Sequence, residues 1–336
     1  MDKVSNLSGD PGLSTTVDQR LIVISRNPHS GKSSTQERVA ELHRQLTLSG
    51  YHVEVPDSVD VVCALAKEGL AAGELRAVIA GGGDGTLNML VKTLPPSVPF
   101  LGFPLGTENL VAKYLGWSAD PRRVCDLLQS GTIVDLDAGL ANGQVFLVMF
   151  SCGLDADVVH RLHSERRGHI THASYLKPIF QALRRYRYAR FEMQASRSAE
   201  MQTNESPVEG YKIVDATTAR WLFVSNLPNY ACQLGITPDA TPTDGLLDWC
   251  AFQGGSFFSS LRYLFSVLLR SHPKLRDCLL GKCEGLALAA QDSTSTPIPY
   301  QIDGDPGGFL PVEIKVLPGR FRAVVDRQWS TRALGK

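Results

Sequence analysis

The sequence predicts an α/β protein, with a Rossmann-like parallel sheet first and a mainly antiparallel β region with helices after it. In the first part, short apolar runs each lead into a turn that contains Gly or Pro, and then into a helix-like pattern. Buried parallel strands joined by helical crossovers have this signature. In the second part, strand-like runs are separated by longer and more polar connections, which is typical of antiparallel pairing.

The parallel part begins with an apolar run at 21–24 that ends in a turn containing Pro28 and Gly31. A helix is predicted at 33–48, because apolar residues recur near helical spacing and Gly50 supplies a stop. The strands and helices that follow are expected at 51–55, 59–70, 77–80, 87–94 and 100–103.

The later part begins after about Asp137, where the character of the chain changes. The segment 197–210 is polar and contains Pro and Gly, which predicts a flexible hairpin or loop. Residues 256–269 show an amphipathic helical pattern with more aromatic residues than core packing requires. The strand-like runs are residues 145–151, 221–225 and 247–252.

The length of 336 residues predicts two domains, because it exceeds one usual compact core and is too short for three. Residues 1–18 are rich in Ser, Asp, Gly and Thr, and we expect a disordered tail there. We expect an α/β domain at 19–138 and a β-rich domain at 139–326. The last strand is expected either to stay in the second domain or to return to the first.

Charge and cysteine content argue against several classes of protein. The 34 basic and 34 acidic residues give a formal net charge of zero, so the molecule as a whole has no field that favours nucleic acid. The seven cysteines are scattered and never spaced as CxxC, which argues against a zinc site and favours a reducing cytoplasm. No run reaches the roughly 18 apolar residues of a membrane-spanning helix, so any membrane contact is expected to be peripheral.

The sharpest local signal is a glycine-rich turn that joins a predicted strand to a predicted helix. Glycines let main-chain N–H groups approach a phosphate that a Cβ would exclude, and the helix adds its positive end. Asp84 would be repelled by phosphate unless a cation lay between them, so the turn implies a metal-bound nucleotide. A tight turn that uses glycine for backbone reasons alone is the alternative. The turn consists of Gly81, Gly82, Gly83, Asp84, Gly85 and Thr86.

A second turn of this kind follows the next predicted strand and opens the next predicted helix. It contains Gly106, Thr107 and Asn109. The carboxyl ends of adjacent parallel strands meet at one edge of a sheet, where open α/β folds place their ligands. We therefore expect the two turns to converge.

The two turns resemble the GGDGT and P-x-GT-x-N motifs of the diacylglycerol kinase catalytic-domain superfamily, which includes sphingosine and ceramide kinases and many bacterial lipid kinases. The nucleotide domain of this family is similar to the core of NAD kinase. The resemblance extends over most of the chain, from about residue 21 to residue 326. Further landmarks that resemble the family pattern are Asn27-Pro28, Ser30-Gly31, Asp137, 153–156, 238–248 and 302–305.

The resemblance implies a kinase that uses ATP and Mg²⁺ to phosphorylate a hydroxyl of diacylglycerol or of a related lipid, such as a sphingoid base or ceramide. The active site is expected in the cleft between the two domains. Asp305 is the candidate base that accepts the proton of the lipid hydroxyl, with Asp303 in the same turn as the fallback. The residues implied at the nucleotide are Asn27, Ser30, Gly31, Gly81, Gly82, Gly83, Asp84, Gly85, Thr86, Gly106, Thr107 and Asn109.

The resemblance also implies two magnesium positions. Asp84 is expected to reach the nucleotide-bound ion through water. A second, structural ion is expected at the Asp244 side chain and at main-chain oxygens of Thr241 and Leu246.

The chain departs from the family pattern at three positions. Leu110 stands where the second turn usually has Asp, so that acid is missing or moved to Glu108. Met89 stands where an acidic residue is often found, and Asp305 is one methylene shorter than the family's Glu. Two rivals therefore stay open: an NAD kinase-like enzyme, and a nucleotide-binding regulatory protein with weakened catalysis.

Two weaker motifs suggest other chemistry. The segment Ser30-Gly31-Lys32-Ser33 ends like a Walker P-loop, but Arg26 stands where that motif needs Gly. Four histidines lack a carboxylate or cysteine partner at ligand spacing, which favours solvated side chains over a zinc site. These histidines are His160, His163, His169 and His172.

The stretch 161–190 combines arginines with interleaved tyrosines, a composition that suits RNA, an anionic membrane surface or a solvated helix face. A lipid kinase must meet its substrate at a membrane, which favours the membrane interpretation over RNA. We expect reversible, salt-sensitive binding to anionic vesicles, with residues 257–269 as the apolar partner. The oligomeric state stays open between a monomer and a homodimer.

Overall fold

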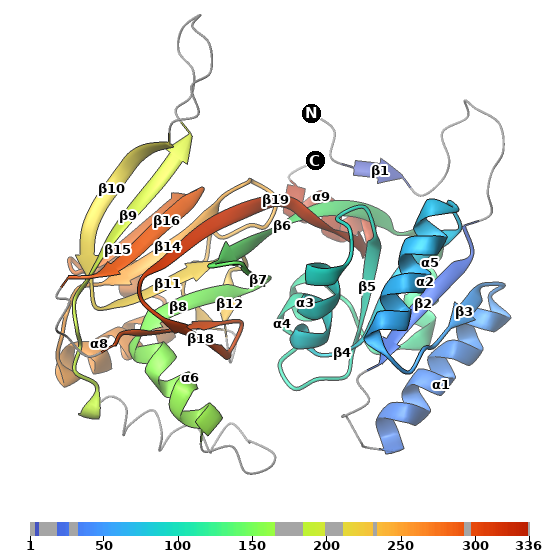
Figure 1. The fold of residues 1–336 in the computed structure, drawn as a ribbon, viewed down its shortest axis with the longest axis horizontal. Coiled ribbons are helices and arrows are strands. Elements are labelled where there is room, and N and C mark those ends of the chain that lie inside the picture. The colour runs from blue at the N-terminus through green and yellow to red at the C-terminus, as the bar shows by residue number, and fades with distance from the viewer. Residues whose placement is uncertain are drawn as a thin grey trace, which may run out of the picture. The chain divides into compact units, whose positions relative to one another are not determined.

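The computed structural model of the protein describes residues 4–6, 19–26, 33–164, 184–198, 211–230, 234–291 and 297–334. The chain divides into two compact units. The first unit contains Met1–Asp137 and Pro318–Lys336, and the second contains Ala138–Leu317. The chain passes from the first unit to the second within strand β6 (Thr132–Ala141) and returns within strand β19 (Val312–Val325) (Figure 1).

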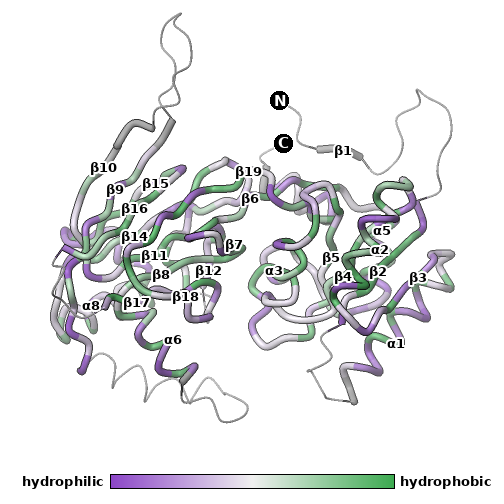
Figure 2. Tube along the Cα trace, in the orientation of Figure 1, coloured by the Kyte–Doolittle hydropathy of each residue, from purple (hydrophilic) through white to green (hydrophobic). Residues whose placement is uncertain are grey.

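The first unit is built on a parallel sheet in which the last part of β19 is followed by β5, β4, β2 and β3 (Figure 1). The apolar runs that predicted these strands are buried, and Ile24, Val78 and Phe100 are fully inaccessible. Figure 2 shows hydrophobic residues along β2 and β4. The predicted parallel α/β sheet is therefore confirmed. The strands are β2 (Leu21–Arg26), β3 (His52–Glu54), β4 (Leu75–Gly82) and β5 (Pro99–Pro104).

Helices connect these strands, and one of them begins earlier than predicted. Helix α3 begins at Asp84 rather than Leu87, because Gly83 is its N-cap and a carboxylate in the first turn interacts favourably with the helix dipole. Strand β1 (Val4–Asn6) lies within the segment expected to be a tail, and it pairs with the open edge of β6. The helices are α1 (Ser33–Leu48), α2 (Val59–Ala71), α3 (Asp84–Thr93), α4 (Leu110–Leu115), α5 (Pro121–Ser130) and α9 (Arg327–Leu334).

The second unit contains an antiparallel sheet in the order β15, β14, β11, β8, β17, β18, as the polar connections predicted. The expected strand 145–151 is instead two strands, β7 (Gln144–Phe146) and β8 (Met149–Gly153). The chain is interrupted between them because the main-chain amides of Leu147 and Val148 donate to the Asp303 carboxylate. The other strands of this sheet are β11 (Trp221–Ser225), β14 (Leu247–Phe252), β15 (Cys278–Cys283), β17 (Pro299–Ile302) and β18 (Asp305–Phe309).

A second set of strands, in the order β10, β9, β16 and the first part of β19, packs against this sheet. The shared core contains Phe150 and Leu222 from one side and Phe191, Leu286 and Ile314 from the other. Strands β9 and β10 are antiparallel partners, and residues 199–210 between them lie outside the described residues. The strands are β9 (Phe191–Ser198), β10 (Tyr211–Ala219) and β16 (Gly285–Ala290).

Two helices and a short strand pair complete the second unit. Helix α6 (Leu154–Ser164) follows β8 directly and contacts β17 and β18. Helix α8 (Phe257–Leu268) is the predicted aromatic helix, and a 3₁₀ turn, His272–Lys274, follows it. The short strands are β12 (Asn229–Tyr230) and β13 (Leu234–Gly235). Within the described parts of the chain, no helix has the length and apolar character needed to cross a membrane.

Candidate active site

The two glycine turns lie side by side at the ends of neighbouring parallel strands. Strand β4 pairs with β5, and the Leu105 N–H donates to the Gly82 carbonyl oxygen at 3.0 Å. Gly106 approaches Gly83 so closely that a Cβ on Gly106 would lie 2.7 Å from the Gly83 Cα. The turns therefore pack backbone against backbone, which a side chain on Gly106 would prevent.

Asn109 fixes the shape of the second turn. The Gly106 N–H donates to the Asn109 Oδ1 at 3.1 Å, and the Asn109 Nδ2 donates to the Gly106 carbonyl oxygen at 2.8 Å. The Asn109 backbone is left-handed, with φ of 50°, a conformation that asparagine tolerates better than most residues. These two hydrogen bonds thus fix the conformation of the turn from Gly106 to Asn109.

Asp84 joins the first glycine turn to the start of α4. Its Oδ2 accepts from the Leu110 N–H at 2.8 Å, and its Oδ1 accepts from the Val111 N–H at 3.0 Å. Burial raises the pKa of Asp84, and the two main-chain donors oppose that shift. The carboxylate therefore caps α4, where the N-terminal N–H groups lack partners within the helix.

The surface beside these turns suits phosphate groups. Gly85, Gly106 and Thr107 are exposed, and a Cβ built on Gly85 would meet no atom within 4 Å. The N-terminal end of α3 therefore has open space beside its main chain at Gly85, which a phosphate that binds main-chain N–H groups requires. Glu108 lies two residues before Leu110, the position at which the family pattern has Asp, and its Oε2 lies 3.7 Å from the Lys113 Nζ. The three other residues expected at the nucleotide, Asn27, Ser30 and Gly31, lie outside the described residues.

The two carboxylates proposed as bases in the second unit have different surroundings. Asp303 accepts from the N–H groups of Leu147, Val148 and Met149 at 2.8, 2.9 and 2.9 Å. Asp305 is exposed and is the first residue of β18. Asp303 thus anchors the turn, while Asp305 stays available at the surface.

A buried polar network, which sequence reasoning missed, supports the same turn. The Gly304 N–H donates to the Gln301 Oε1 at 2.7 Å, and the Gln301 Nε2 donates to the Ser151 Oγ at 3.0 Å. Ser151 in turn donates to the Asp155 Oδ2 at 2.6 Å. Burial raises the pKa of Asp155 to about 6, although hydrogen bonds to Ser151, Gln301 and Tyr230 lower it in part. Asp155 and Gly304 had a signal in the sequence, as parts of the family landmarks 153–156 and 302–305, whereas Gln301 and Ser151 had none.

The loop expected to hold a structural metal ion contains an internal cation instead. The Lys282 Nζ lies 2.8 Å from the Asp244 Oδ2, 3.4 Å from the Asp248 Oδ2 and 3.5 Å from the Asp239 carbonyl oxygen. The other Asp244 oxygen accepts from the Leu246 N–H at 3.0 Å. With the ammonium group there, the Asp244 carboxylate does not fit a divalent cation. The structure thus argues against the predicted site at Thr241, Asp244 and Leu246, and no step below depends on it.

Of the four histidines for which solvated side chains were predicted rather than a zinc site, two, His160 and His163, lie within the described residues. His160 is hydrogen-bonded through Nε2 to the Tyr300 carbonyl oxygen at 2.9 Å, and its ring packs against Phe309. In the described ranges, no group of three or more His, Cys, Asp or Glu side chains is placed to hold a metal ion. His169 and His172 lie outside those ranges.

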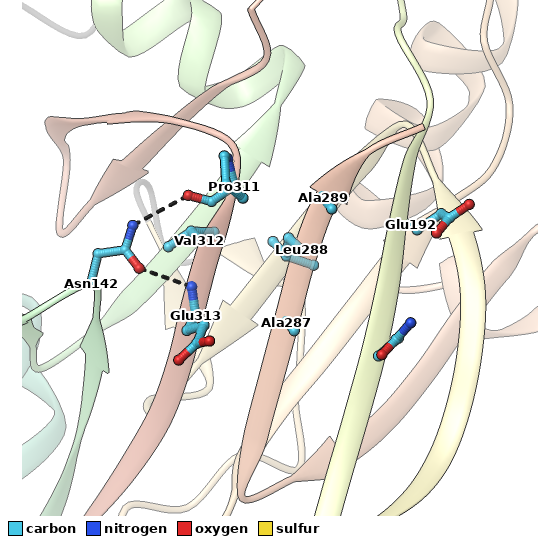
Figure 3. A pocket seen from close by; sticks show the side chains of 9 residues that line it. Asn142, Glu192, Ala287, Leu288, Ala289, Pro311, Val312 and Glu313 are labelled. Carbon is cyan, nitrogen blue, oxygen red and sulfur yellow. Dashed lines mark hydrogen bonds between the residues drawn. The ribbon is translucent and has the colours of Figure 1, made fainter. Parts of the chain in front are cut away.

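Two cavities formed by described residues, one in each unit, lie away from the predicted site residues. One, of about 430 Å³, lies on β9, β16 and β19 (Figure 3). There Asn142 holds β19, because its Oδ1 accepts from the Glu313 N–H at 3.0 Å and its Nδ2 donates to the Pro311 carbonyl oxygen at 3.3 Å. Another, of about 570 Å³, lies between Arg123 and Arg327 in the first unit. The candidate site is thus formed by turns and not by either cavity.

Comparisons with known proteins match both units. Residues 20–141 match the model of the diacylglycerol kinase catalytic domain, and residues 148–325 match that of the YegS C-terminal NAD kinase beta sandwich-like domain. The diacylglycerol kinase of Bacillus subtilis is 25% identical over 315 residues, which cover 90% of this chain and 95% of that protein. A probable YegS-like lipid kinase of Pseudomonas fluorescens is 35% identical over 115 residues, 33% of this chain and 37% of that protein.

A solved structure shares the fold. The crystal structure of a putative diacylglycerol kinase from Bacillus anthracis superimposes with a TM-score of 0.65 at 16% identity, covering 94% of this chain and 99% of that chain. This similarity extends through both units. The two family models confirm the resemblance seen in the glycine turns. The chain belongs to the diacylglycerol kinase catalytic-domain superfamily, with a YegS-type C-terminal domain, and it is a kinase, a phosphotransferase with an alcohol group as acceptor.

Proposed function

We propose that the protein is an ATP- and Mg²⁺-dependent lipid kinase that phosphorylates a hydroxyl of diacylglycerol or of a related lipid, such as a sphingoid base or ceramide. The observation that carries the proposal is the pair of glycine turns packed backbone to backbone at the start of α3. The names of the relatives, a diacylglycerol kinase and a probable lipid kinase, support a lipid as the acceptor.

In this proposal the nucleotide phosphates bind main-chain N–H groups of the glycine turn 82–86, with Thr107 and Asn109 beside them. Mg²⁺ bound with the nucleotide would neutralise charge on the phosphate oxygens, and Asp84 would hold it through water. The hydrogen bonds of Asp84 to Leu110 and Val111 leave each carboxylate oxygen a further lone pair for that water. Asn27, Ser30 and Gly31 are proposed beside the nucleotide by family resemblance.

Asp305 is proposed to accept the proton of the lipid hydroxyl as that oxygen attacks the γ-phosphorus. Its exposure leaves it accessible to an acceptor, whereas the Asp303 carboxylate is bound to three main-chain amides. Phosphoryl transfer requires mainly positioning and charge compensation, so a weak carboxylate base is sufficient.

Two other functions compete with this one. A related NAD kinase activity would use the same glycine turn with a different acceptor. A regulatory protein with weakened catalysis would bind the nucleotide through the same amides, and Met89, Leu110 and Asp305 are the departures that favour it.

One assay separates the three functions. Purified protein is incubated with labelled ATP and Mg²⁺, and offered diacylglycerol, ceramide, a sphingoid base or NAD. We expect label in one lipid class and its loss when EDTA removes the metal. Label in NAD would favour the NAD kinase, and nucleotide binding without any labelled acceptor would favour the regulatory protein. The Asp305→Asn variant, assayed in parallel, controls for a contaminating kinase.

A further inference from the structure

Helix α8 exposes a continuous apolar face. Phe258, Phe265, Leu268 and the C-cap residue Leu269 are 79%, 57%, 56% and 76% exposed. With 3.6 residues per turn, these side chains and the half-buried Leu261 fall within an arc of about 100° on the helix. Contiguous exposed apolar side chains of this size mark an interaction surface more often than a solvated one.

The opposite face fixes α8 to the second unit. Tyr263 is fully buried, and its hydroxyl accepts from the Gly254 N–H at 2.8 Å and donates to Asp277. The helix begins in a capping box, in which Ser256 and Ser259 exchange hydrogen bonds. The exposed face is therefore part of an anchored helix and not of a fraying end.

Basic residues occur in α8 and in the short segment that follows it. The segment 256–276 contains four Arg or Lys residues and no Asp or Glu, although the chain as a whole has no net charge. Arg262, on the edge of the face, pairs with Asp277. The other three are exposed and follow the helix: Arg270 comes after its C-cap residue, Lys274 lies in the 3₁₀ turn, and Arg276 follows that turn. An apolar helix face with basic residues along its edge is the pattern of an interfacial membrane helix.

We propose that α8 docks the protein on a bilayer that contains anionic lipid, with the apolar face among the acyl chains and Arg270, Lys274 and Arg276 at the headgroup phosphates. The inference rests on the proposed function, since a lipid substrate has to be met at a membrane. Charge complementarity selects this partner. A second copy that met the same face would offer these cations no acidic partner from this segment, because residues 256–276 contain no Asp or Glu.

The test measures binding of the full chain to vesicles by sedimentation. Vesicles of phosphatidylcholine alone are compared with vesicles that also contain phosphatidylglycerol. The apolar variant replaces Phe258, Phe265 and Leu269 with Ser, and we expect binding at least about tenfold weaker, because three apolar side chains no longer enter the interface. The matched control is Leu48→Ser, since Leu48 is 71% exposed at the end of α1 in the first unit. This variant should bind as the wild type does.

A second variant tests the charges. Gln at Arg270, Lys274 and Arg276 should abolish the preference for phosphatidylglycerol, at roughly fivefold per residue, and the wild-type preference should weaken with added salt. The matched control carries Gln at three exposed basic residues of the first unit and should keep the preference. These residues are Lys67, Lys92 and Arg123.

The inference would be overturned if the wild type did not bind vesicles, or if the serine variant bound them as tightly as the wild type. It would also be overturned if the preference for phosphatidylglycerol survived the Gln substitutions. A serine variant that loses self-association but keeps vesicle binding would make the face a protein interface instead. The kinase proposal fails separately. If the wild type binds vesicles as expected and phosphorylates no lipid, docking stands and the proposed function does not. Melting temperatures of all variants should match the wild type, because the substituted side chains are exposed.

Discussion

At the residue scale, two carboxylates fix the local backbone by accepting hydrogen bonds from several main-chain N–H groups. Asp84 accepts from two N–H groups at the start of α4, and Asp303 accepts from three between β7 and β8. Hydrogen bonds to an ionised acceptor are stronger than neutral ones. Each of these residues therefore has a structural role, beside any chemistry at the site.

Substitutions of Asp303 and Asp305, the two acids of the 303–305 turn, should have different effects on stability and activity. Asp305→Asn is expected to slow single-turnover phosphoryl transfer by about two to four orders of magnitude with an unchanged melting temperature, because general-base assistance has that size and Asp305 is exposed. Asp303→Asn is expected to lower the free energy of unfolding by about 2–4 kcal/mol, because three amides lose a charged acceptor. Asp305→Glu serves as the control that retains the charge and should remain active. Full activity in Asp305→Asn would remove Asp305 from the mechanism.

Asp155 predicts how stability depends on pH. Burial raises the pKa of Asp155 from its usual value near 4 to about 6, so the folded protein holds this proton over a pH range in which the unfolded chain has lost it. The stabilising contribution of Asp155 is therefore complete below about pH 4 and is lost as the pH rises to about 6. The free energy of unfolding should fall by a few kcal/mol over this range, because one pKa unit corresponds to about 1.4 kcal/mol. Asp155→Asn should flatten that slope in denaturant titrations. Asp248, whose pKa burial also raises to about 6, acts in the same window, so the difference between variant and wild type is the quantity to measure.

At the element scale, the contact between the two glycine turns should be intolerant of a side chain. Gly106→Ala would place its Cβ 2.7 Å from both the Gly83 Cα and the Asn109 Oδ1, so we expect a lower melting temperature and weaker ATP binding. Gly85→Ala is the matched comparison, because its Cβ meets no protein atom within 4 Å. It should leave the melting temperature unchanged while weakening ATP binding, if phosphates approach the amides there. Normal ATP affinity in both variants would mean that the turns serve the fold alone.

The loop that contains Asp239, Asp244 and Asp248 should depend on Lys282 and not on a metal ion. Removing the ammonium leaves Asp248, which is nearly buried, without a counter-charge, so Lys282→Met is expected to lower the free energy of unfolding by about 2 kcal/mol. Added Mg²⁺ should raise the melting temperature of this variant more than that of the wild type. The control is Lys67→Met, at an exposed lysine of α2. An equal response to Mg²⁺ in all three proteins would count against an internal cation.

At the scale of the whole molecule, local patterns predicted most of the fold. Runs such as 21–24 and 77–80 identify buried strands because their apolar character is continuous. The partners of Asp84, Gln301 and Lys282 could not be predicted in this way. Their contacts join residues 26 to 150 positions apart, and such contacts depend on how distant elements pack. The glycine turns were found because their spacing follows the strand ends, whereas a glutamine inside a strand carries no signal of its own.

The division of the chain also predicts how the first unit can be isolated. Residues 318–336 return to it, where the Trp117 Nε1 donates to the Val324 carbonyl oxygen at 2.7 Å and Phe321 packs on Phe100. The fragment 1–137 alone should therefore not fold. Joining it to 318–336 through a short Gly/Ser linker should restore cooperative melting and ATP binding, because Asp137 already accepts from the Gly319 N–H at 2.8 Å and the new ends are close.

The control for this fusion carries Phe321→Ser, which removes a buried aromatic side chain and should cost about 3–5 kcal/mol of stability. Circular dichroism and calorimetry with ATP measure folding and binding in all three fragments. If the 1–137 fragment melted cooperatively by itself, the returning strand would be dispensable. If the fusion folded without binding ATP, the nucleotide site would need residues of the second unit. The predicted outcome, a folded fusion that binds ATP but transfers no phosphate, follows from Asp305 lying outside the fragment.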